Sequence, residues 1–350
     1  MKLWQYILRR LILLVPVMLG ITLITFSLAW FATGGHLENQ YLTNIDKLSE
    51  ERIQRIVDQY GFDEPWYVQY GSYLKNLLSG DWGYSTSVNR PVTDVLGDLF
   101  PASIELSVTA MIFSVIIGIP LGILSATHRD RPTDHITRFL ALSGVSIPVF
   151  WLALLLQLYL SFYLGKQGFD FFPLLGRYDP LVAINHPSLT QGPTGFLLID
   201  TLLAGDGIAF MDVVRHLILP AFTLAFSTLA IISRMMRASM LEVMGLDFIR
   251  TARAKGLDEK TVINKHARRN ALIPTVTVIG LSFGGLINGV VLTETIFAWP
   301  GLGRWSTRAI AFLDVAAIMS FVVLTALIYV LANLIVDVLY AVLDPRVRLE

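Results

Sequence analysis

Long apolar runs alternate with polar segments along the chain, and the runs have the length of membrane-spanning helices. A bilayer core about 30 Å thick requires roughly 20 apolar residues in a helix. Six runs reach that length, near residues 11–31, 104–126, 139–163, 217–235, 271–293 and 316–342. The pattern therefore predicts an all-α, polytopic membrane protein with six transmembrane helices.

Prolines and glycines modify these runs. A proline inside a helix removes a backbone hydrogen bond and can kink the helix, so kinked spans with room for a passage are expected at Pro16, Pro120, Pro148, Pro220 and Pro274. The fifth run carries two overlapping small-xxx-small pairs, formed by Gly280, Gly284, Gly285 and Gly289. Such pairs let helices approach closely. We interpret these pairs mainly as sites of tight helix packing. A pore surface can use the same contacts.

Composition supports the membrane assignment and narrows the chemistry. The chain is 54% hydrophobic and 15% charged, with a mean hydropathy of +0.60, which is too apolar for a water-soluble domain. The absence of cysteine excludes disulfides and Cys-based metal sites. The sequence has no HExxH, GxSxG or GxxxxGK[ST] motif. His128, His135, His216 and His266 are expected to be solvated or interfacial, so we predict no catalytic residue, metal site or cofactor in this chain.

The positions of Lys and Arg predict the orientation, because cytoplasmic loops retain positive residues. All basic clusters fall on one side if both termini are cytoplasmic. These clusters are Lys2, Arg9 and Arg10; Arg129, Arg131 and Arg138; Arg346 and Arg348; and the richest group, from Arg234 to Arg269. The first run is too long for a signal peptide and is expected to stay as an anchor. The mildly acidic segment 32–100 then faces outward.

We predict three parts of the chain. Residues 1–31 form the N-terminal segment and first transmembrane helix, 32–100 an extracytoplasmic loop subdomain, and 101–350 a five-helix core with a cytoplasmic loop at about 236–270. The outer subdomain should contain a capped helix from Ser49 to Gly61 and a second helix from Pro65 to Leu78. Its aromatic residues suit either an interfacial belt or a cap that closes over a ligand-bearing partner.

The cytoplasmic loop predicts a compact helical unit. Asp247 is expected to cap a short helix from Phe248 to Lys255, Gly256 to end that helix in a left-handed turn, and Asp258 to cap a second helix toward Asn270. Contacts with anionic lipid would explain the positive charge of this loop. They would not explain a glycine between two capped helices, which favours a docking unit for a protein partner.

Several motifs resemble one known family. They are QYILRRLILLVPVMLGITLITF at 5–26, GDWGYS at 80–85, PVTDVL at 91–96, TGFLLIDTL at 194–202, LPA at 219–221, SMLEVMGLDFIRTARAKGL at 239–257, HARRNALIP at 266–274 and TETIFAWPGLGR at 293–304. The chain resembles the binding-protein-dependent ABC permeases of the dipeptide, oligopeptide and nickel group, and is most similar to the B subunits of the dipeptide branch. The resemblance covers nearly the whole chain.

The resemblance implies a type I ABC importer fold in the inner membrane of a bacterium or archaeon, with this chain forming half of the pore. Its implied partners are a second homologous permease, two cytoplasmic ATP-binding subunits that hold ATP and magnesium, an extracytoplasmic solute-binding protein and membrane lipid, with no nucleic acid. It further implies an EAA-type loop that docks on the ATPase. That loop starts at Arg250, where an acidic residue is usual, and closes at Pro274. The predicted contact residues are Arg250, Thr251, Ala252, Arg253, Lys255, Gly256, Leu257 and Asp258.

Alternatives remain at this point. Nickel chelates and glutathione are possible cargoes within the same family. An ion-coupled secondary peptide carrier would need titrating groups inside the spans, whereas Glu105, Glu294, Asp314 and Asp337 fall near the ends of the predicted runs. A structural membrane anchor would explain the basic loop but not the kinked, glycine-rich spans.

Overall fold

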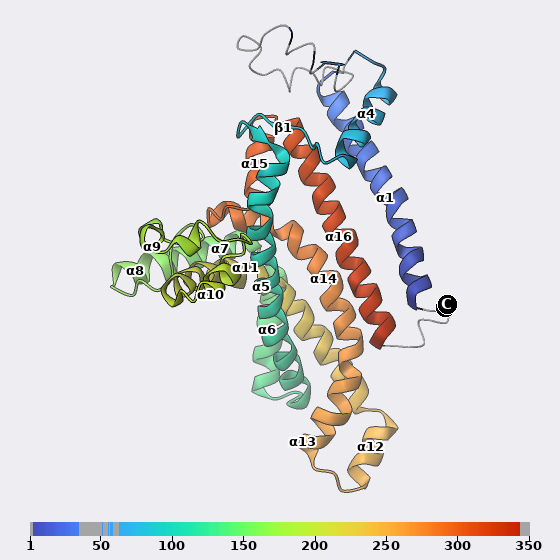
Figure 1. The fold of residues 1–350 in the computed structure, drawn as a ribbon. Helices are drawn as coiled ribbons and strands as arrows, with labels where there is room; N and C mark the ends of the chain where they lie inside the picture. Colours follow the sequence, from blue (N-terminus) through green and yellow to red (C-terminus); the bar gives the residue numbers. More distant parts are fainter. Residues whose placement is uncertain (1–2, 35–50, 52–54, 56, 59–62, 344–350) are drawn as a thin grey trace.

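The computed structural model describes residues 3–34, 51, 55, 57–58 and 63–343. Most of the predicted helix Ser49–Gly61 lies outside these residues, as do Lys2, Arg346 and Arg348. The described part is almost entirely helical (Figure 1). Its first half contains α1 (Leu3–Ala32), α4 (Trp66–Leu78), β1 (Tyr84–Ser85), β2 (Arg90–Pro91), α5 (Val92–Thr127), α6 (Pro132–Ser146), α7 (Val149–Leu156), the π-helix η2 (Gln157–Tyr163) and α8 (Leu164–Lys166).

The second half continues with a group of short helices and four long ones. They are α9 (Pro180–Asn185), the 3-10 helix η3 (Pro187–Leu189), α10 (Leu197–Leu203), α11 (Gly207–Met244), α12 (Asp247–Ala254), α13 (Glu259–Thr261), the π-helix η4 (Val262–Ala267), α14 (Arg268–Ile296), α15 (Leu302–Ala311) and α16 (Val315–Leu343). Figure 1 shows α12 and α13 at one end of the molecule, and α15 and the β1–β2 hairpin toward the other.

Five helical segments among the described residues are long and apolar enough to cross a membrane, namely Ile7–Ala32, Val92–Thr127, Val149–Lys166, Gly207–Met244 and Val315–Ile335. The count rises to six if Glu259–Leu286 and Gly289–Ile296, which meet at a bend of 53°, form one span. The structure therefore confirms a polytopic all-α fold and corrects several boundaries.

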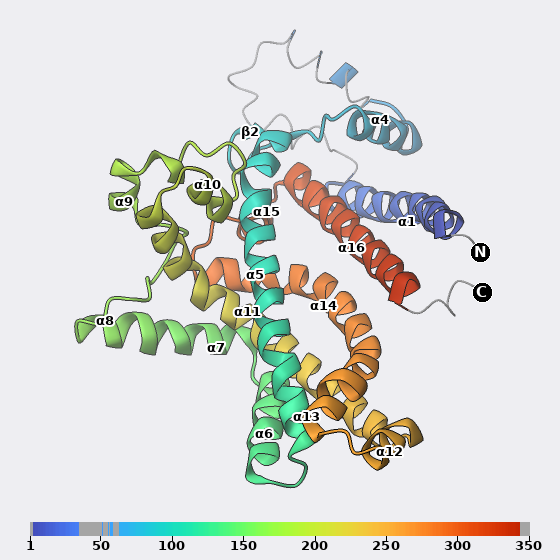
Figure 2. The same cartoon turned by 60° about the horizontal axis from the view of Figure 1, so that its bottom comes forward.

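The third predicted span, 139–163, is wrong as a single helix. α6 ends at Ser146 and α7 begins at Val149, with Ile147 and Pro148 extended between them. Proline disfavours the helical conformation of the residue before it, so Pro148 breaks the helix here. Figure 2 shows the consequence, since α7 and α8 extend sideways from the bundle and away from α6. The other four prolines lie inside continuous helices.

The start of the second span is also corrected. α5 begins at Val92, twelve residues before the predicted run, because the polar residues around Asp94 and Asp98 continue the helix beyond its apolar part. Glu105 therefore lies well inside a helix rather than near its end, and its side chain is buried. His216 was expected to be solvated or interfacial, but α11 buries it, with Nδ1 2.9 Å from the carbonyl oxygen of Asp212.

α11 is the central helix and packs along its length against α5 and α14. Small residues allow the close contact with α5, since a Cβ added to Gly122 would come within 2.6 Å of Met236 Cβ and of the Ser233 carbonyl oxygen. Alanines such as Ala110 and Ala225 are fully buried in the same core. Close backbone approach through small residues is a usual way for helices to associate in lipid.

α1 lies at the periphery, where it packs mainly against α16 (Figure 1). The aromatic residues of α4 divide between two roles. Tyr70 and Tyr73 pack on Phe26 of α1, with ring centroids 5.5 and 5.7 Å away, whereas Trp66 and Tyr67 are exposed. Two of the aromatic residues therefore attach α4 to the first span.

Candidate functional site

The predicted docking loop forms a helical unit at the end of α11, which we call the knob and define as residues 246–261. α12 ends at Ala254 with Lys255 as its C-cap, and Gly256 follows with φ +78°, the left-handed conformation that favours glycine. Asp258 accepts a hydrogen bond from the backbone N–H of Thr261 at 3.0 Å and so caps α13. This contact lowers the pKa of the Asp258 carboxyl. The predicted glycine turn and second cap are confirmed.

The prediction for the first cap is wrong. Leu246 occupies the N-cap position of α12 in an extended conformation, and Asp247 is the first residue of the helix. The Asp247 carboxylate contacts Arg250 at 3.2 Å on an exposed surface. Its negative charge still lies at the N-terminal end of the helix dipole, where it is favourable, but it makes no capping hydrogen bond.

Apolar residues fix the knob to the transmembrane helices. Ile249 and Ala252 of α12 are buried together with Val262 and Ala267 of η4, and the same cluster includes Met240 of α11. A well-packed cluster transmits displacement because it has little free volume. α12 is therefore mechanically connected to α11 and to the helical run that continues into α14.

The outer surface of the knob combines cations with apolar side chains. Seven of the eight predicted contact residues are exposed, whereas Ala252 is 7% exposed and faces the cluster. Three large apolar side chains are also exposed, Leu246 at 46%, Phe248 at 41% and Leu257 at 41%. Of these, the sequence prediction included only Leu257. The sequence did contain one sign of Leu246 and Phe248, because these two apolar residues flank Asp247 in the exposed loop.

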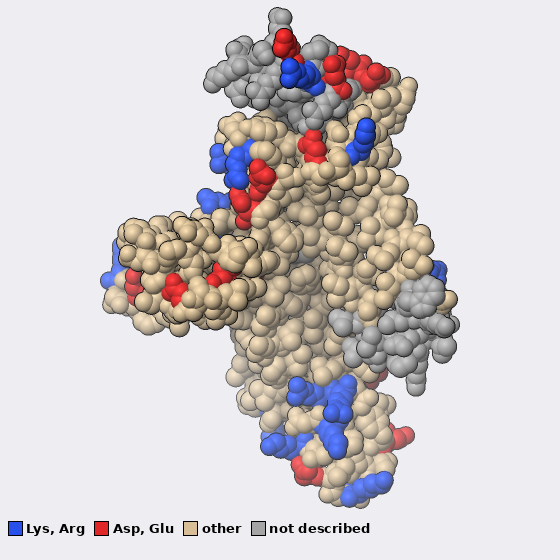
Figure 3. Space-filling model, viewed as in Figure 1, with Lys and Arg blue, Asp and Glu red and all other residues tan. Residues whose placement is uncertain are grey.

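One ion pair holds the two arms of the knob together. Arg253 of α12 donates to Glu259 of α13 at 2.6 Å, across the turn at Gly256. Both side chains are substantially exposed, at 40% and 55%, so the pair contributes at most about 1 kcal/mol to stability. Other cations of this end remain exposed, and Figure 3 shows Lys and Arg gathered over the lower part of the molecule.

A second polar centre lies at the opposite end, where the motif at 293–304 folds back on itself. The buried carboxylate of Glu294 accepts hydrogen bonds from Ser103 at 2.5 Å and from the backbone N–H groups of Gly303 and Arg304 at 2.8 and 3.0 Å. Trp299 donates its indole N–H to the Ala102 carbonyl oxygen at 3.0 Å. These bonds fix the turn between α14 and α15 against α5.

The segment between α8 and α11 is attached to the same region by a buried ion pair. Arg177 contacts Glu105 at 2.7 Å and also donates to the carbonyl oxygen of Gly195 at 2.8 Å. The second oxygen of Glu105 accepts from the N–H of Leu198 at 2.8 Å, and the Arg177 guanidinium lies 5.8 Å from the ring centroid of Trp299. The sequence patterns contained no signal for this network.

The four glycines of the fifth run have different surroundings. A Cβ added to Gly284 would meet the Tyr329 ring of α16 at 2.5 Å, and one added to Gly289 would meet Leu224 of α11 at 3.0 Å. Gly285 is exposed with open space around it, and Gly280 is partly buried. Gly284 and Gly289 thus provide packing within the chain, while Gly285 presents a free small-residue surface.

Within the described ranges, no group of three or more His, Asp or Glu side chains is arranged to hold a metal ion.

The fold and the knob define a class of protein, a polytopic helical membrane protein with a basic helical unit projecting from one end. The chain belongs to the family described as "Binding-protein-dependent transport system inner membrane component", whose sequence model matches residues 118–349.

Relatives match the chain from end to end. The dipeptide transport system permease protein DppB of Alkalihalophilus pseudofirmus is 42% identical, over 98% of this chain and 99% of the relative. The protein of the same name from Escherichia coli K12 is 43% identical, over 98% of both chains. The oligopeptide transport system permease protein AppB of Bacillus subtilis is 36% identical, over 98% of this chain and 99% of the relative.

Proposed function

We propose that this chain is the permease subunit of an ATP-driven, binding-protein-dependent importer of dipeptides or short peptides, and that it forms half of the translocation pathway in the inner membrane of a bacterium. The observation that carries the proposal is the similarity over 98% of the chain to permeases named for dipeptide transport. A relative named for di- and tripeptide transport, from Pseudomonas aeruginosa, is 41% identical over the same share of the chain.

The proposed partners follow from the family. A second homologous permease completes the pore, two cytoplasmic ATP-binding subunits supply the hydrolysis, and an extracytoplasmic solute-binding protein delivers the cargo. In this assembly the chain itself is not an enzyme. It transmits motion between the ATPase subunits and the membrane helices.

The knob is the proposed coupling element. Its exposed cations Arg250, Arg253 and Lys255 and its exposed apolar side chains Phe248 and Leu257 form a surface suited to a groove on the ATPase. Closure of the ATPase pair on ATP would displace α12, and the buried cluster around Ile249 would pass the displacement to α11 and α14. An outward-facing cavity would then open below the loaded binding protein.

Transport in liposomes tests the proposal. The chain is reconstituted with its neighbouring-gene subunits and binding protein, and ATP-dependent uptake of a labelled dipeptide is compared with uptake of nickel and glutathione. We expect dipeptide uptake that needs both ATP and the binding protein. Preferred uptake of nickel or glutathione would contradict the peptide assignment, and uptake without ATP would indicate an ion-coupled carrier.

Coupling through the knob is tested with two matched substitutions. Gly256→Asp places a side chain and a negative charge at the tip of the knob, and we expect it to abolish transport-stimulated ATP hydrolysis while the protein stays in the membrane. Gly205→Asp is the control, because Gly205 also has a left-handed backbone, at φ +65°, with open space around it, but precedes the opposite end of α11. Normal stimulation in Gly256→Asp, or equal loss in both variants, would contradict docking at this turn.

A further inference from the structure

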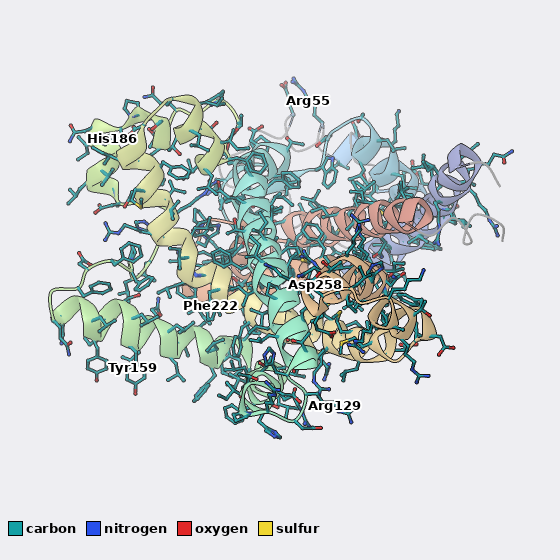
Figure 4. All side chains as sticks on the ribbon, turned by 90° about the horizontal axis from the view of Figure 1, so that it is seen from below. Arg55, Arg129, Tyr159, His186, Phe222 and Asp258 are labelled. Atoms are coloured by element: carbon teal, nitrogen blue, oxygen red, sulfur yellow. The ribbon has the colours of Figure 1, made fainter. Side chains whose placement is uncertain are left out.

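A cavity of about 260 Å³ lies between α5, α6 and α11, toward the end of the bundle that carries the knob. Figure 4 views this end from below, with Arg129 marking the turn between α5 and α6. Three arginines line the cavity, Arg138 of α6 and Arg234 and Arg237 of α11, together with the Ser233 hydroxyl and the apolar side chain of Leu142.

The cavity has an excess of positive charge. Arg237 is balanced, because it donates to both carboxylate oxygens of Asp134 at 2.9 Å. The next carboxylate of the α5–α6 turn, that of Asp130, pairs with Arg129 at 3.3 Å. Within the part of the chain that the structure describes, Arg138 and Arg234 have no carboxylate partner. Two cations on facing helices are therefore available to an anion.

A buried hydroxyl adds a third group that can contact an anion. Ser233 is 2% exposed, it lines the cavity, and its hydroxyl makes no hydrogen bond with any other described residue. Buried polar groups in folded proteins nearly always have a hydrogen-bond partner. The Ser233 hydroxyl can therefore donate a hydrogen bond to an acceptor atom of a ligand that enters the cavity.

The surface beside the cavity is apolar. α6 exposes Ile136 at 60%, Phe139 at 68%, Leu142 at 61% and Val145 at 52%, although α6 itself is not one of the candidate membrane spans. A small inorganic anion would gain nothing from these side chains. An amphiphile with an anionic head would use both the cations and the apolar face.

We propose that this cavity binds the phosphate group of an anionic phospholipid in the leaflet on the knob side of the membrane. Arg138, Arg234 and the Ser233 hydroxyl contact the phosphate oxygens, and the acyl chains lie along the exposed face of α6. Arginine forks match the geometry of phosphate, and basic pockets between membrane helices are suited to lipid head groups.

Native mass spectrometry tests the site. The full chain, purified with the subunits that accompany it, is placed in nanodiscs of phosphatidylglycerol mixed with phosphatidylcholine, and the retained lipids are counted. The test variant is R138Q/R234Q, and the matched control is R129Q/R131Q, which removes two exposed positive charges from the neighbouring turn. A second test variant, Ser233→Ala, keeps both charges and removes only the hydroxyl group.

We expect the wild type to retain phosphatidylglycerol preferentially. With about 1 kcal/mol for each cation, R138Q/R234Q should lose about thirtyfold in this preference, and the control should keep it. Ser233→Ala should lower the amount of retained lipid severalfold without changing the preference, because both lipids carry the phosphate that the hydroxyl contacts. Equal preference in R138Q/R234Q and wild type would overturn the proposal, as would an equal loss in the control. Displacement of the lipid by millimolar inorganic phosphate would also overturn it, because the site would then recognise free phosphate.

Discussion

Arg177 forms a two-bond ion pair with Glu105, with Nη2 2.7 Å and Nε 3.2 Å from the same carboxylate oxygen. Their side chains are only 8% and 4% exposed. The pair joins the interior of α5 to the segment that precedes α9, and Arg177 also contacts Trp299. Three regions that are distant in sequence therefore depend on one guanidinium group.

Removing one member of this pair should be strongly destabilising. Arg177→Met leaves the Glu105 carboxylate buried without its cation, and loss of one partner of a buried pair costs about 3–5 kcal/mol. We expect a lower thermal unfolding midpoint for Arg177→Met, and partial recovery in R177M/E105Q, where no charge remains unpaired. Additive losses in a double-mutant cycle would contradict the coupling.

The β1–β2 hairpin should depend on Asp314. This carboxylate accepts from Ser85 Oγ at 2.6 Å and Ser87 N–H at 2.9 Å, and its other oxygen accepts from Ala317 N–H at 3.1 Å at the start of α16. Asp314→Ala removes the acceptor of three hydrogen bonds. Ser85 Oγ keeps a contact with Ser87 Oγ at 3.2 Å, and each donor that stays buried without a partner costs about 1–3 kcal/mol. Limited proteolysis should cut residues 80–91 faster than in the wild type. Asp98→Ala, which breaks only an exposed pair with Arg90, should leave the cutting rate unchanged.

Stability should fall in acid because of Asp134. Hydrogen bonds from Arg237 hold the pKa of this carboxyl well below its usual range. A lowered pKa in the folded state stabilises the protein above the unfolded value of about 3.9, and this contribution is lost as the pH falls toward the folded value. Asp134→Asn should therefore destabilise the protein by about 3 kcal/mol at pH 7, and the difference from wild type should shrink below about pH 4.

Unfolding midpoints measured between pH 3 and pH 7 check this prediction. Asp98→Asn serves as the control, because it removes a carboxylate from an exposed pair. A deficit of Asp134→Asn that is the same at every pH would show that the lost packing, rather than the charge, causes the effect.

Two adjacent glycines should respond differently to alanine. Gly284→Ala forces the Tyr329 ring to move, and overpacking typically costs about 1–3 kcal/mol. Gly285→Ala meets no atom within 4 Å, so it should be neutral or stabilise the helix by up to about 1 kcal/mol. Equal unfolding midpoints for the two variants would contradict the close packing of α14 against α16.

The free surface at Gly285 can be tested separately. If a second permease chain packs there, Gly285→Leu should reduce co-purification of that chain without lowering the unfolding midpoint of this one. Unchanged co-purification would place the contact elsewhere. This experiment distinguishes packing between chains from packing within the chain.

The general architecture could be predicted because bilayer thickness fixes the length of an apolar helix. The knob could be predicted because its signals are local, since Gly256 and Asp258 act within a few residues of themselves. Asp247 shows the limit of this reasoning. A carboxylate near a helix start suits the N-cap and the first helical position alike, and only the backbone of Leu246 decides between them.

The buried polar contacts could not be predicted from one sequence. Glu105 and Arg177 are 72 residues apart, and Ser85 and Asp314 are 229 residues apart, so no local pattern links them. The break before α7 was missed for another reason. A proline within a long apolar run permits either a kink or a break, and hydropathy is the same in both cases.

The packing of α1 against α16 has a consequence for biogenesis. Among the described helices, α1 is synthesised first and its partner α16 last, so α1 must remain in the bilayer without α16 until synthesis of the described helices is complete. Its sequence suits that interval, because the hydroxyls of Thr22 and Thr25 bond to carbonyl oxygens of the same helix, at 2.9 Å to Met18 and 2.7 Å to Ile21. Both hydroxyl groups therefore have a hydrogen-bond partner within α1 before α16 is synthesised.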